Sequence, residues 1–403
     1  MPRPDVALIS PYPPAGRRHA GRSGVASYAG NLAQALSDRG LAVTVVAPTE
    51  PDLPAGREAD GAVRVERRFD RGPAAVPSAA RAALATGAPV VHLQHEFFLY
   101  GGIGSMPGLV PGLGMLRASG VGPVVTMHHA VDPAGVDADF VRMHRVRAPR
   151  ALLRVGLGGV QSTIGSLARR VIVHEGAFRS VVRDAVVVPH GVESVAPEVE
   201  PAGVTACSDG DRDGRLTMLC FGFVAPYKGL ELALEAASLA PDAVRLIIVG
   251  GEHPRLVDSG ERYGDSLRER WPGAGEFAGY VPDAELPAWF ALSDLALFLY
   301  PRPFATSGAL ALAISHGLPT LLSPGLGDLV GAPAELVAPT EAPALAARLR
   351  ELAAERAALA PLREQSATIT RDRSWGTVAG RHEEIYEEVS RAERSAGRTL
   401  RPL

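Results

Sequence analysis

Lys228 is the residue whose type and position most clearly indicate chemistry. The chain has 41 basic residues, and 40 of them are arginine. The single lysine stands in the segment 220–230, where a predicted strand passes into a predicted helix. A lysine at that point can hold a phosphate as a compact point charge. The alternative is an ordinary surface lysine.

A second candidate anion site follows in the same half of the chain. Thr306, Ser307 and Gly308 form the predicted N-cap and first turn of a helix that comes after a strand and the loop around Arg302. The free N–H groups and the dipole of a helix start attract an anion. The alternative is a plain serine N-cap. Two such helix starts in one domain indicate a ligand with two phosphates.

In the first half, the segment PYPPAGRRHAGRSGVASYAG follows the first predicted strand. Arg22 and Gly24 precede or open a helix there, and N–H groups at a helix start can approach an anion. The alternative is a flexible loop with solvated arginines. The dinucleotide fingerprint G-x-G-x-x-G is absent from the segment, which argues against a nicotinamide cofactor.

Histidines stand at the ends of several predicted strands, and the clearest are His95, followed by Glu96, and His128. The run HLQHE resembles a metal motif, but residues three apart on a strand face opposite sides. We therefore expect no zinc site. Histidines gathered at one sheet edge favour a functional site, and the alternative is packed, hydrogen-bonded side chains.

Short apolar runs alternate with longer amphipathic segments, which predicts two successive doubly wound α/β units, each with a parallel sheet. The expected strands are 6–10, 43–47, 90–95, 124–128, 171–174, 186–189, 216–221, 246–249, 276–280, 295–300, 319–322 and 335–338. The expected helices are 25–36, 230–239, 283–291, 307–315, 342–359 and 374–394. Segments 67–71 and 101–120 are expected to be surface loops.

These elements predict an N-terminal domain at 1–197, a linker at 198–214, a C-terminal domain at 215–372, and a last helix and tail at 373–403. The linker is polar and rich in Gly and Asp. Ligands of open α/β sheets bind beyond the carboxyl ends of the strands. We therefore expect a binding cleft between the two domains.

Composition narrows the classes of function. The chain has 403 residues, 46% hydrophobic, with a net charge of −3, which excludes a disordered chain and a basic nucleic-acid binder. Two cysteines fit a reducing compartment. We expect no signal peptide, no membrane span and a cytoplasmic location. The basic run Arg142–Arg154 could meet a phosphorylated acceptor or an anionic membrane surface, or could be a solvated helix face.

An ordered set of segments resembles the family-4 retaining glycosyltransferases of the GT-B fold over nearly the whole chain. The segments are GRSGVASY, HLQHE, VVTMHH, VIVHEGAFR, VVVPHGVE, FGFVAPYKGLE, LIIVGG, FAGYVPDAELPAWFALSDLALFLYP and SGALALAISHGLPTLLSP. The resemblance implies an N-terminal acceptor domain, a C-terminal nucleotide-sugar domain, and a last helix that crosses back to the first domain.

The resemblance also implies roles for individual residues. Lys228 and His128 would be catalytic, with Lys228 on the donor diphosphate and His128 beside the donor sugar. The other donor contacts would be Gly24, Gly222, Tyr280, Val281, Arg302, Thr306, Ser307 and Gly308, and the acceptor side would be lined by Arg22, His95 and Glu96.

The chain departs from the family pattern at three positions. Phe223 stands where the family has an arginine, and Phe304 and Leu312 stand where it has two glutamates. Neither phenylalanine nor leucine can accept a hydrogen bond. Arg302, Thr306 and Glu252 are the candidates to replace the lost contacts.

The predicted function is retaining transfer of a sugar from a nucleoside-diphosphate sugar, UDP- or GDP-linked, to a small molecule or glycoconjugate. The setting would be secondary metabolism such as antibiotic biosynthesis. No metal and no cofactor is expected, and the oligomeric state stays open. Two alternatives remain, namely a nucleotide-sugar-binding or degenerate GT-B protein without transfer activity, and a GT-B nucleotide-sugar epimerase.

Overall fold

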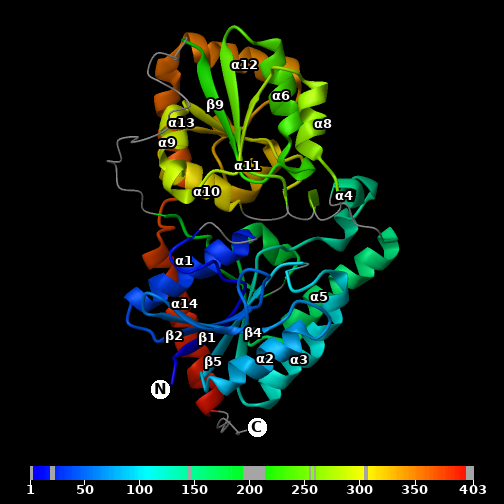
Figure 1. Cartoon of the computed structure of the whole chain (residues 1–403), viewed down its shortest axis with the longest axis vertical. Coiled ribbons are helices and arrows are strands. Elements are labelled where there is room, and N and C mark those ends of the chain that lie inside the picture. The colour runs from blue at the N-terminus through cyan, green and yellow to red at the C-terminus, as the bar shows by residue number, and fades with distance from the viewer. Residues whose placement is uncertain are drawn as a thin grey trace. The chain divides into compact units, whose positions relative to one another are not determined.

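The computed structural model divides the chain into two compact units. The first contains Met1–Gly191 and Arg373–Leu403, and the second contains Val192–Pro303 and Ser307–Asp372 (Figure 1). The described residues are 3–18, 23–97, 99–143, 148–182, 184–193, 214–253, 256–257, 260–303 and 307–395. The predicted linker 198–214 lies outside them except for Gly214.

The first unit contains an eight-stranded sheet in the order β3-β4-β2-β1-β5-β6-β7-β8. All neighbouring strands are parallel except β3 and β4, which form an antiparallel pair. The strands are β1 (Val6–Ile9), β2 (Val43–Pro48), β3 (Gly56–Asp60), β4 (Val63–Phe69), β5 (Val90–His95), β6 (Gly122–Met127), β7 (Arg170–Val173) and β8 (Val186–Val187). The central strands are buried along their whole length and mainly apolar, as expected for a sheet covered on both faces, although β5 carries the buried polar residues His92, Gln94 and His95.

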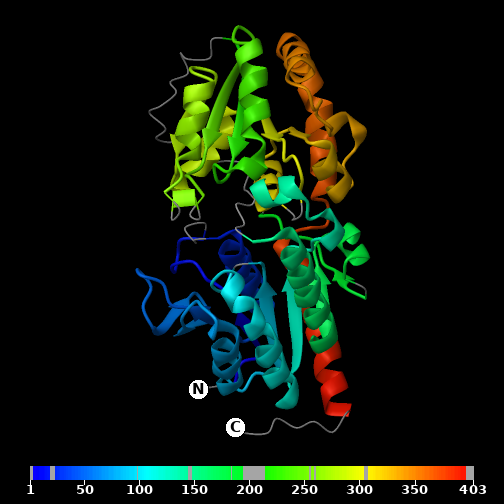
Figure 2. The ribbon, with the colours of Figure 1, turned by 90° about the vertical axis from the view of Figure 1, so that its right-hand side faces the viewer.

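Helices cover both faces of this sheet (Figures 1 and 2). On one face α1 (Gly24–Asp38) packs against α14 (Trp375–Ser395), the last described helix of the chain. On the other face lie α2 (Ala75–Ala85), α3 (Leu109–Ala118) and α5 (Arg150–Leu167). Shorter turns of helix are η1 (Ile103–Gly108), η2 (Pro133–Gly135), α4 (Ala138–Met143) and η3 (Gly176–Ser180).

Two predicted surface loops are wrong. Segment 101–120 contains η1 and α3, because Leu109, Leu113 and Leu116 have helical spacing and are buried, a pattern that the surrounding Gly and Pro residues masked. Segment 67–71 begins inside β4. That strand has alternating burial, with Arg67 on the buried face, and its several charged residues concealed the alternation.

The second unit contains a parallel five-stranded sheet in the order β11-β10-β9-β12-β13. The strands are β9 (Leu216–Phe221), β10 (Val244–Val249), β11 (Glu276–Gly279), β12 (Leu295–Phe298) and β13 (Thr320–Leu322). The predicted strand 335–338 is wrong. Pro333 starts the short turn η7 (Ala334–Leu336) there, and Val337 makes only an isolated bridge with Leu322.

The helices of the second unit surround a single hydrophobic core. They are η5 (Pro226–Lys228), α6 (Leu230–Leu239), α8 (Tyr263–Arg270), η6 (Asp283–Glu285), α9 (Leu286–Leu292), α10 (Gly308–Ser315), α11 (Pro324–Val330), α12 (Ala342–Ala354), η8 (Arg356–Ala358) and α13 (Leu359–Ile369). Helices α6 and α12 pack together and against β10, whereas α10 contacts β9 and α13. In the described part of the chain, no helix combines the length and the apolar character needed to cross a membrane.

Both sheets have a point where the strand order reverses direction. It lies between β1 and β5 in the first unit and between β9 and β12 in the second. Ligands of doubly wound sheets bind beyond the carboxyl ends of the strands at such a point. The residues that follow these four strands are therefore the first place to look for a site.

Candidate functional site

Lys228 lies at the switch point of the second unit, in the turn η5 that follows β9. Its Nζ donates a hydrogen bond to Tyr300 Oη at 2.6 Å and lies 4.5 Å from the centre of the Tyr300 ring. Burial lowers the pKa of Lys228, and no carboxylate among the described residues offsets this effect. One of its three N–H donors is used by Tyr300. The arrangement holds an ammonium ready to receive an anion.

Tyr300 joins Lys228 to the start of helix α10. Its hydroxyl is 2.8 Å from Ser307 Oγ, which in turn accepts a hydrogen bond from Leu310 N at 3.1 Å as the N-cap of α10. Because the ammonium can only donate, Tyr300 accepts from Lys228 and its own proton is directed to Ser307. The two anion sites predicted separately from the sequence thus belong to one hydrogen-bonded chain. Tyr300 itself was not predicted.

Gly222 follows β9 and leaves room beside the ammonium. Its φ is +113°, and a Cβ built on it would lie 3.2 Å from Lys228 Nζ and 3.5 Å from the Cβ of Ala309 in the first turn of α10. A side chain there would be strained and would also fill the space at the ammonium. Gly222 and Lys228 are therefore brought together at the first turn of α10, which begins at Gly308.

The other predicted donor contacts are more scattered. Tyr280 follows the edge strand β11, and 59% of its surface is exposed, whereas its neighbour Val281 is buried in the core. Gly251, at the end of β10, packs beside Tyr280. Arg302 is exposed two residues after Tyr300. Thr306 lies outside the described residues.

The structure describes two of the three positions at which the chain departs from the family pattern. Leu312 lies in α10 and belongs to the hydrophobic core. Phe223 packs on His253, with 5.1 Å between ring centres. Phe304 lies outside the described residues. Glu252 accepts a hydrogen bond from Gly264 N through Oε1, and its buried Oε2 has no hydrogen-bond partner among the described residues.

Removal of the Tyr300 hydroxyl tests the link between the ammonium and α10. We expect Tyr300→Phe to lower turnover roughly tenfold, equivalent to about 1.4 kcal/mol of barrier, because Lys228 and Ser307 lose the partner that orients them. The loss of unfolding free energy should be about 1 kcal/mol. Steady-state kinetics and denaturant unfolding measure the two effects. Ser366→Ala, which removes a buried hydroxyl that bonds Thr320 elsewhere in the second unit, is the matched control.

In the first unit, His128 is the centre of a buried row of side chains. Its Nε2 lies 2.9 Å from Gln94 Oε1 and its Nδ1 lies 3.2 Å from His174 Nε2. The row continues from His174 to the Val188 carbonyl at 3.0 Å. On the other side of Gln94, His92 contacts Tyr386 of α14. Both ring nitrogens of His128 are therefore engaged within the unit, which suits a positioning role better than that of a free base.

His95 and Glu96 follow β5, at the switch point of the first unit. The His95 ring is 2% exposed, and neither of its nitrogens has a hydrogen-bond partner among the described residues. Burial lowers the pKa of His95 to about 3, so the ring is neutral. Glu96 Oε1 lies 3.7 Å from Nε2 of His129, whose ring is neutral because burial lowers its pKa to about 3. A neutral imidazole offers one donor and one acceptor, which suits a hydroxyl group.

Helix α1 begins after the first switch-point strand. Ser23 caps it by accepting a hydrogen bond from Ala26 N, and Gly24 is its first residue. A Cβ on Gly24 would meet nothing within 4 Å, so packing inside the unit does not require glycine there. Arg22 lies outside the described residues. Within the described ranges, no group of three or more His, Cys, Asp or Glu side chains is placed to hold a metal ion.

Comparison with known proteins shows which family and fold this chain is similar to. The family model described as Glycosyltransferase Family 4 matches residues 22–195. Solved structures with the same fold extend the likeness over the rest of the chain. Residues 22–195 therefore form a family-4 glycosyltransferase domain, and the chain as a whole has the GT-B fold. No curated protein sequence matches it closely enough to count as a relative.

Three solved structures illustrate the likeness of this glycosyltransferase to known folds. Sucrose-phosphate synthase from Thermosynechococcus elongatus is 18% identical, with a TM-score of 0.71 over 96% of this chain and 99% of that one. HepE from Anabaena, in complex with UDP-glucose, is 14% identical, with a TM-score of 0.66 over 95% and 99%. AviGT4, a glycosyltransferase involved in avilamycin A biosynthesis, is 18% identical, with a TM-score of 0.56 over 96% and 98%.

Proposed function

We propose that this glycosyltransferase transfers a sugar, with retention of configuration, from a nucleoside-diphosphate sugar to a hydroxyl-bearing small molecule or glycoconjugate. The observation that carries the proposal is the half-buried Lys228 ammonium beside the start of α10, which uses one of its three donors within the described ranges. A ligand with two phosphates would use both features. HepE, which shares the fold, is described in complex with UDP and with UDP-glucose.

The chemical step needs stabilisation of a leaving diphosphate. As the bond from the anomeric carbon to the phosphate oxygen breaks, positive charge grows on the sugar and negative charge on the phosphate. Lys228 and the N–H groups of Gly308 and Ala309 are fixed donors that strengthen their contacts as this charge develops. Tyr300 holds the ammonium in place for that purpose.

Retention follows in this proposal from attack on the same face of the sugar as the leaving group. A leaving phosphate oxygen accepts the proton of the acceptor hydroxyl, so no separate pair of catalytic carboxylates is required. His128, with both ring nitrogens engaged, would position groups near the donor sugar. His95 and Glu96 would line the acceptor side, and Gly24 would be a further donor contact.

The nucleoside end of the donor would lie toward the outer strands of the second unit. Tyr280 offers an exposed ring beyond the carboxyl end of β11, on the same sheet edge as Gly222. Glu252 has a buried carboxylate oxygen that no group in the described part of the chain contacts by a hydrogen bond, and it can accept one from a hydroxyl group. Together with Arg302 and Thr306, it is the candidate to replace the two family glutamates.

A direct assay tests the proposal. The purified protein is incubated with UDP- and GDP-sugars, with and without a panel of alcohol acceptors, and nucleoside diphosphate release is measured. Release that depends on an acceptor supports transfer. Conversion of the donor without an acceptor would indicate an epimerase. Nucleotide-sugar binding without any conversion would indicate a degenerate binding protein, the outcome that Leu312 in the core favours.

A matched pair of glycine variants locates the diphosphate. We expect Gly222→Ala to weaken UDP or GDP binding by tenfold or more, because its methyl group would crowd Lys228 Nζ. Gly273 has a φ of +75°, but an added methyl group there would meet nothing within 4 Å, so Gly273→Ala carries the backbone strain alone. Calorimetry on both variants separates strain from crowding. Equal affinities would place the diphosphate elsewhere.

A further inference from the structure

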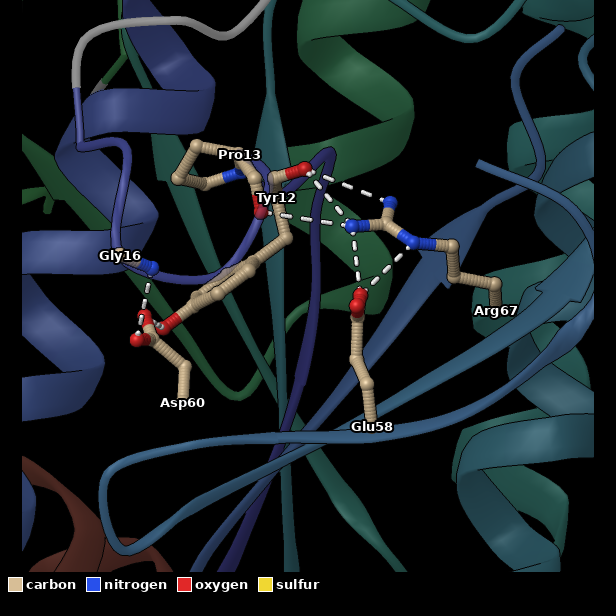
Figure 3. Close-up of polar contacts among 6 residues, drawn as sticks. All are labelled: Tyr12, Pro13, Gly16, Glu58, Asp60 and Arg67. Atoms are coloured by element: carbon tan, nitrogen blue, oxygen red, sulfur yellow. Dashed lines mark hydrogen bonds and ion pairs between the residues drawn. The ribbon is translucent and has the colours of Figure 1, made fainter. Parts of the chain in front are cut away.

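The loop that follows β1 is held by a buried arginine on the neighbouring hairpin. Arg67 occupies a core-facing position of β4 and is 2% exposed. Its guanidinium donates to the carbonyl oxygens of Tyr12 and Pro13, each at 3.3 Å (Figure 3). Its charge is matched by Glu58 on β3, with 2.7 Å between Nη2 and Oε1. One cation thus connects the hairpin to the loop backbone.

Asp60 provides a second anchor from the end of β3. Its Oδ2 accepts a hydrogen bond from the Tyr12 hydroxyl at 2.9 Å, and its Oδ1 accepts one from Gly16 N at 3.3 Å (Figure 3). Arg18 pairs with the same carboxylate, with 3.5 Å between Nη2 and Oδ2. The hairpin therefore contacts both the start and the end of the described loop segment 12–18.

Helix α1 forms the opposite wall of this segment. A Cβ on Gly30 would lie 2.5 Å from Arg18 Nη1 and 3.3 Å from Pro13 Cγ, so glycine lets the loop lie directly against the helix. Arg18, which in the sequence could be read as a solvated side chain, is packed between α1 and Asp60. The loop is fixed from two sides by side chains that are far apart in sequence.

A purely structural explanation fits Arg67 poorly. The alternation Val63, Val65, Arg67, Phe69 puts an arginine where an apolar side chain would fill the core without burying a charge. Desolvation of a charge is costly, and apolar replacements of buried ion pairs are often neutral or stabilising. The carbonyl contacts to Tyr12 and Pro13 are what an apolar residue would lose.

We propose that Arg67 is a positioning residue, which together with Asp60 sets the shape of segment 12–18 after β1. It thereby fixes this segment against Gly30 of α1, the helix whose first residue is Gly24. Its effect on turnover rests on the proposed function, in which Gly24 contacts the donor. Its effect on the loop is independent of the proposed function.

Limited proteolysis tests the loop directly, because trypsin cleaves after Arg17 and Arg18. We expect Arg67→Gln to raise the rate of cleavage at these two bonds about tenfold or more under native conditions, as the loop opens more often. Arg68→Gln is the matched control, since Arg68 is on the same strand but faces outward to Glu66. Cleavage sites are mapped by mass spectrometry. Equal cleavage in both variants would overturn the proposal.

Kinetics test the second step, at a temperature where every variant is fully folded. We expect Arg67→Gln to lower kcat about tenfold or more, Arg67→Lys to restore part of it, and Arg68→Gln to leave it unchanged. A loosened loop with unchanged kcat would overturn the role in turnover. If the unaltered protein released no nucleoside diphosphate, the proposed function would fail while the proteolysis result would still decide the loop. Tyr12→Phe, which removes one hydrogen bond to Asp60, replaces Arg67→Gln if that variant does not fold, with the same expected directions.

Discussion

Replacement of Lys228 by methionine is expected to lower nucleoside diphosphate release by a hundredfold or more, because it removes a fixed donor to the leaving phosphate. The fold should survive. Burial lowers the pKa of Lys228, so the folded protein disfavours its charge, and no carboxylate of the described chain would be left unpaired. Steady-state release assays and thermal unfolding measure the two effects together.

Arg262→Met is the matched control for this experiment. It removes a cation of the same unit whose side chain is 84% exposed and which, among the described residues, pairs with Asp265 on the surface, so turnover should stay within about twofold. Lys228→Arg keeps the charge but not the compact shape, and it should recover only part of the rate. Turnover of Lys228→Met within threefold of the unaltered protein would remove Lys228 from the site.

Acid is expected to unfold the first unit before the second. Burial lowers the pKa of His95, His129 and His174 to about 3 and that of His382 to about 4, and it also lowers the pKa of His92 and His128. All six belong to the first unit. The unfolded chain binds protons below pH 6.5, whereas the folded unit does not until the pH falls to the lowered values. The stability that these neutral histidines give the first unit is complete above pH 6.5 and is lost as the pH falls toward 4.

Each such histidine lowers the free energy of unfolding by roughly 1 kcal/mol for every pH unit below 6.5. Several together can therefore remove the whole stability of a domain near pH 5. The chain has three tryptophans. Trp375 belongs to the first unit, whereas Trp271 and Trp289 belong to the second. A variant that keeps only Trp375 therefore reports on the first unit, and a variant that lacks Trp375 reports on the second. His382→Leu should reduce the pH slope by about one proton. Acid transitions at the same pH in both units would contradict the prediction.

The sequence predicted elements whose signal is local. Continuous apolar runs identified most of the parallel strands, and the strand-to-helix positions of Lys228 and Ser307 were also located correctly. That these positions bind an anion stays a prediction. The pairing of those two sites through Tyr300 was not predicted, because a tyrosine at a strand end also reads as a core residue. The hairpin β3–β4 was missed because charged side chains interrupt its alternation.

Contacts between distant segments set the limit of sequence reasoning. His92 meets Tyr386 across 294 positions, and Arg67 meets Tyr12 across 55. No spacing rule along the chain encodes such partners, since they depend on how the sheet and its covering helices pack. The role of Arg67 could have been suspected from its position in a pattern that otherwise alternates with valine and phenylalanine.

The hydrogen-bonded row through His128 determines which ring nitrogens carry a hydrogen. Three hydrogen bonds connect the Val188 oxygen to the Gln94 oxygen through His174 and His128, and each needs one hydrogen. Two neutral imidazoles supply only two hydrogens. If the oxygen and nitrogen of the Gln94 amide exchange places, every hydrogen bond in the row has its hydrogen. All the hydrogens from Tyr386 to Val188 then point in the same direction along the row. A single ring could not reverse its tautomer without its neighbours. The orientation of His128 is therefore a shared property of the whole row, from the last helix to the last strand of the first sheet.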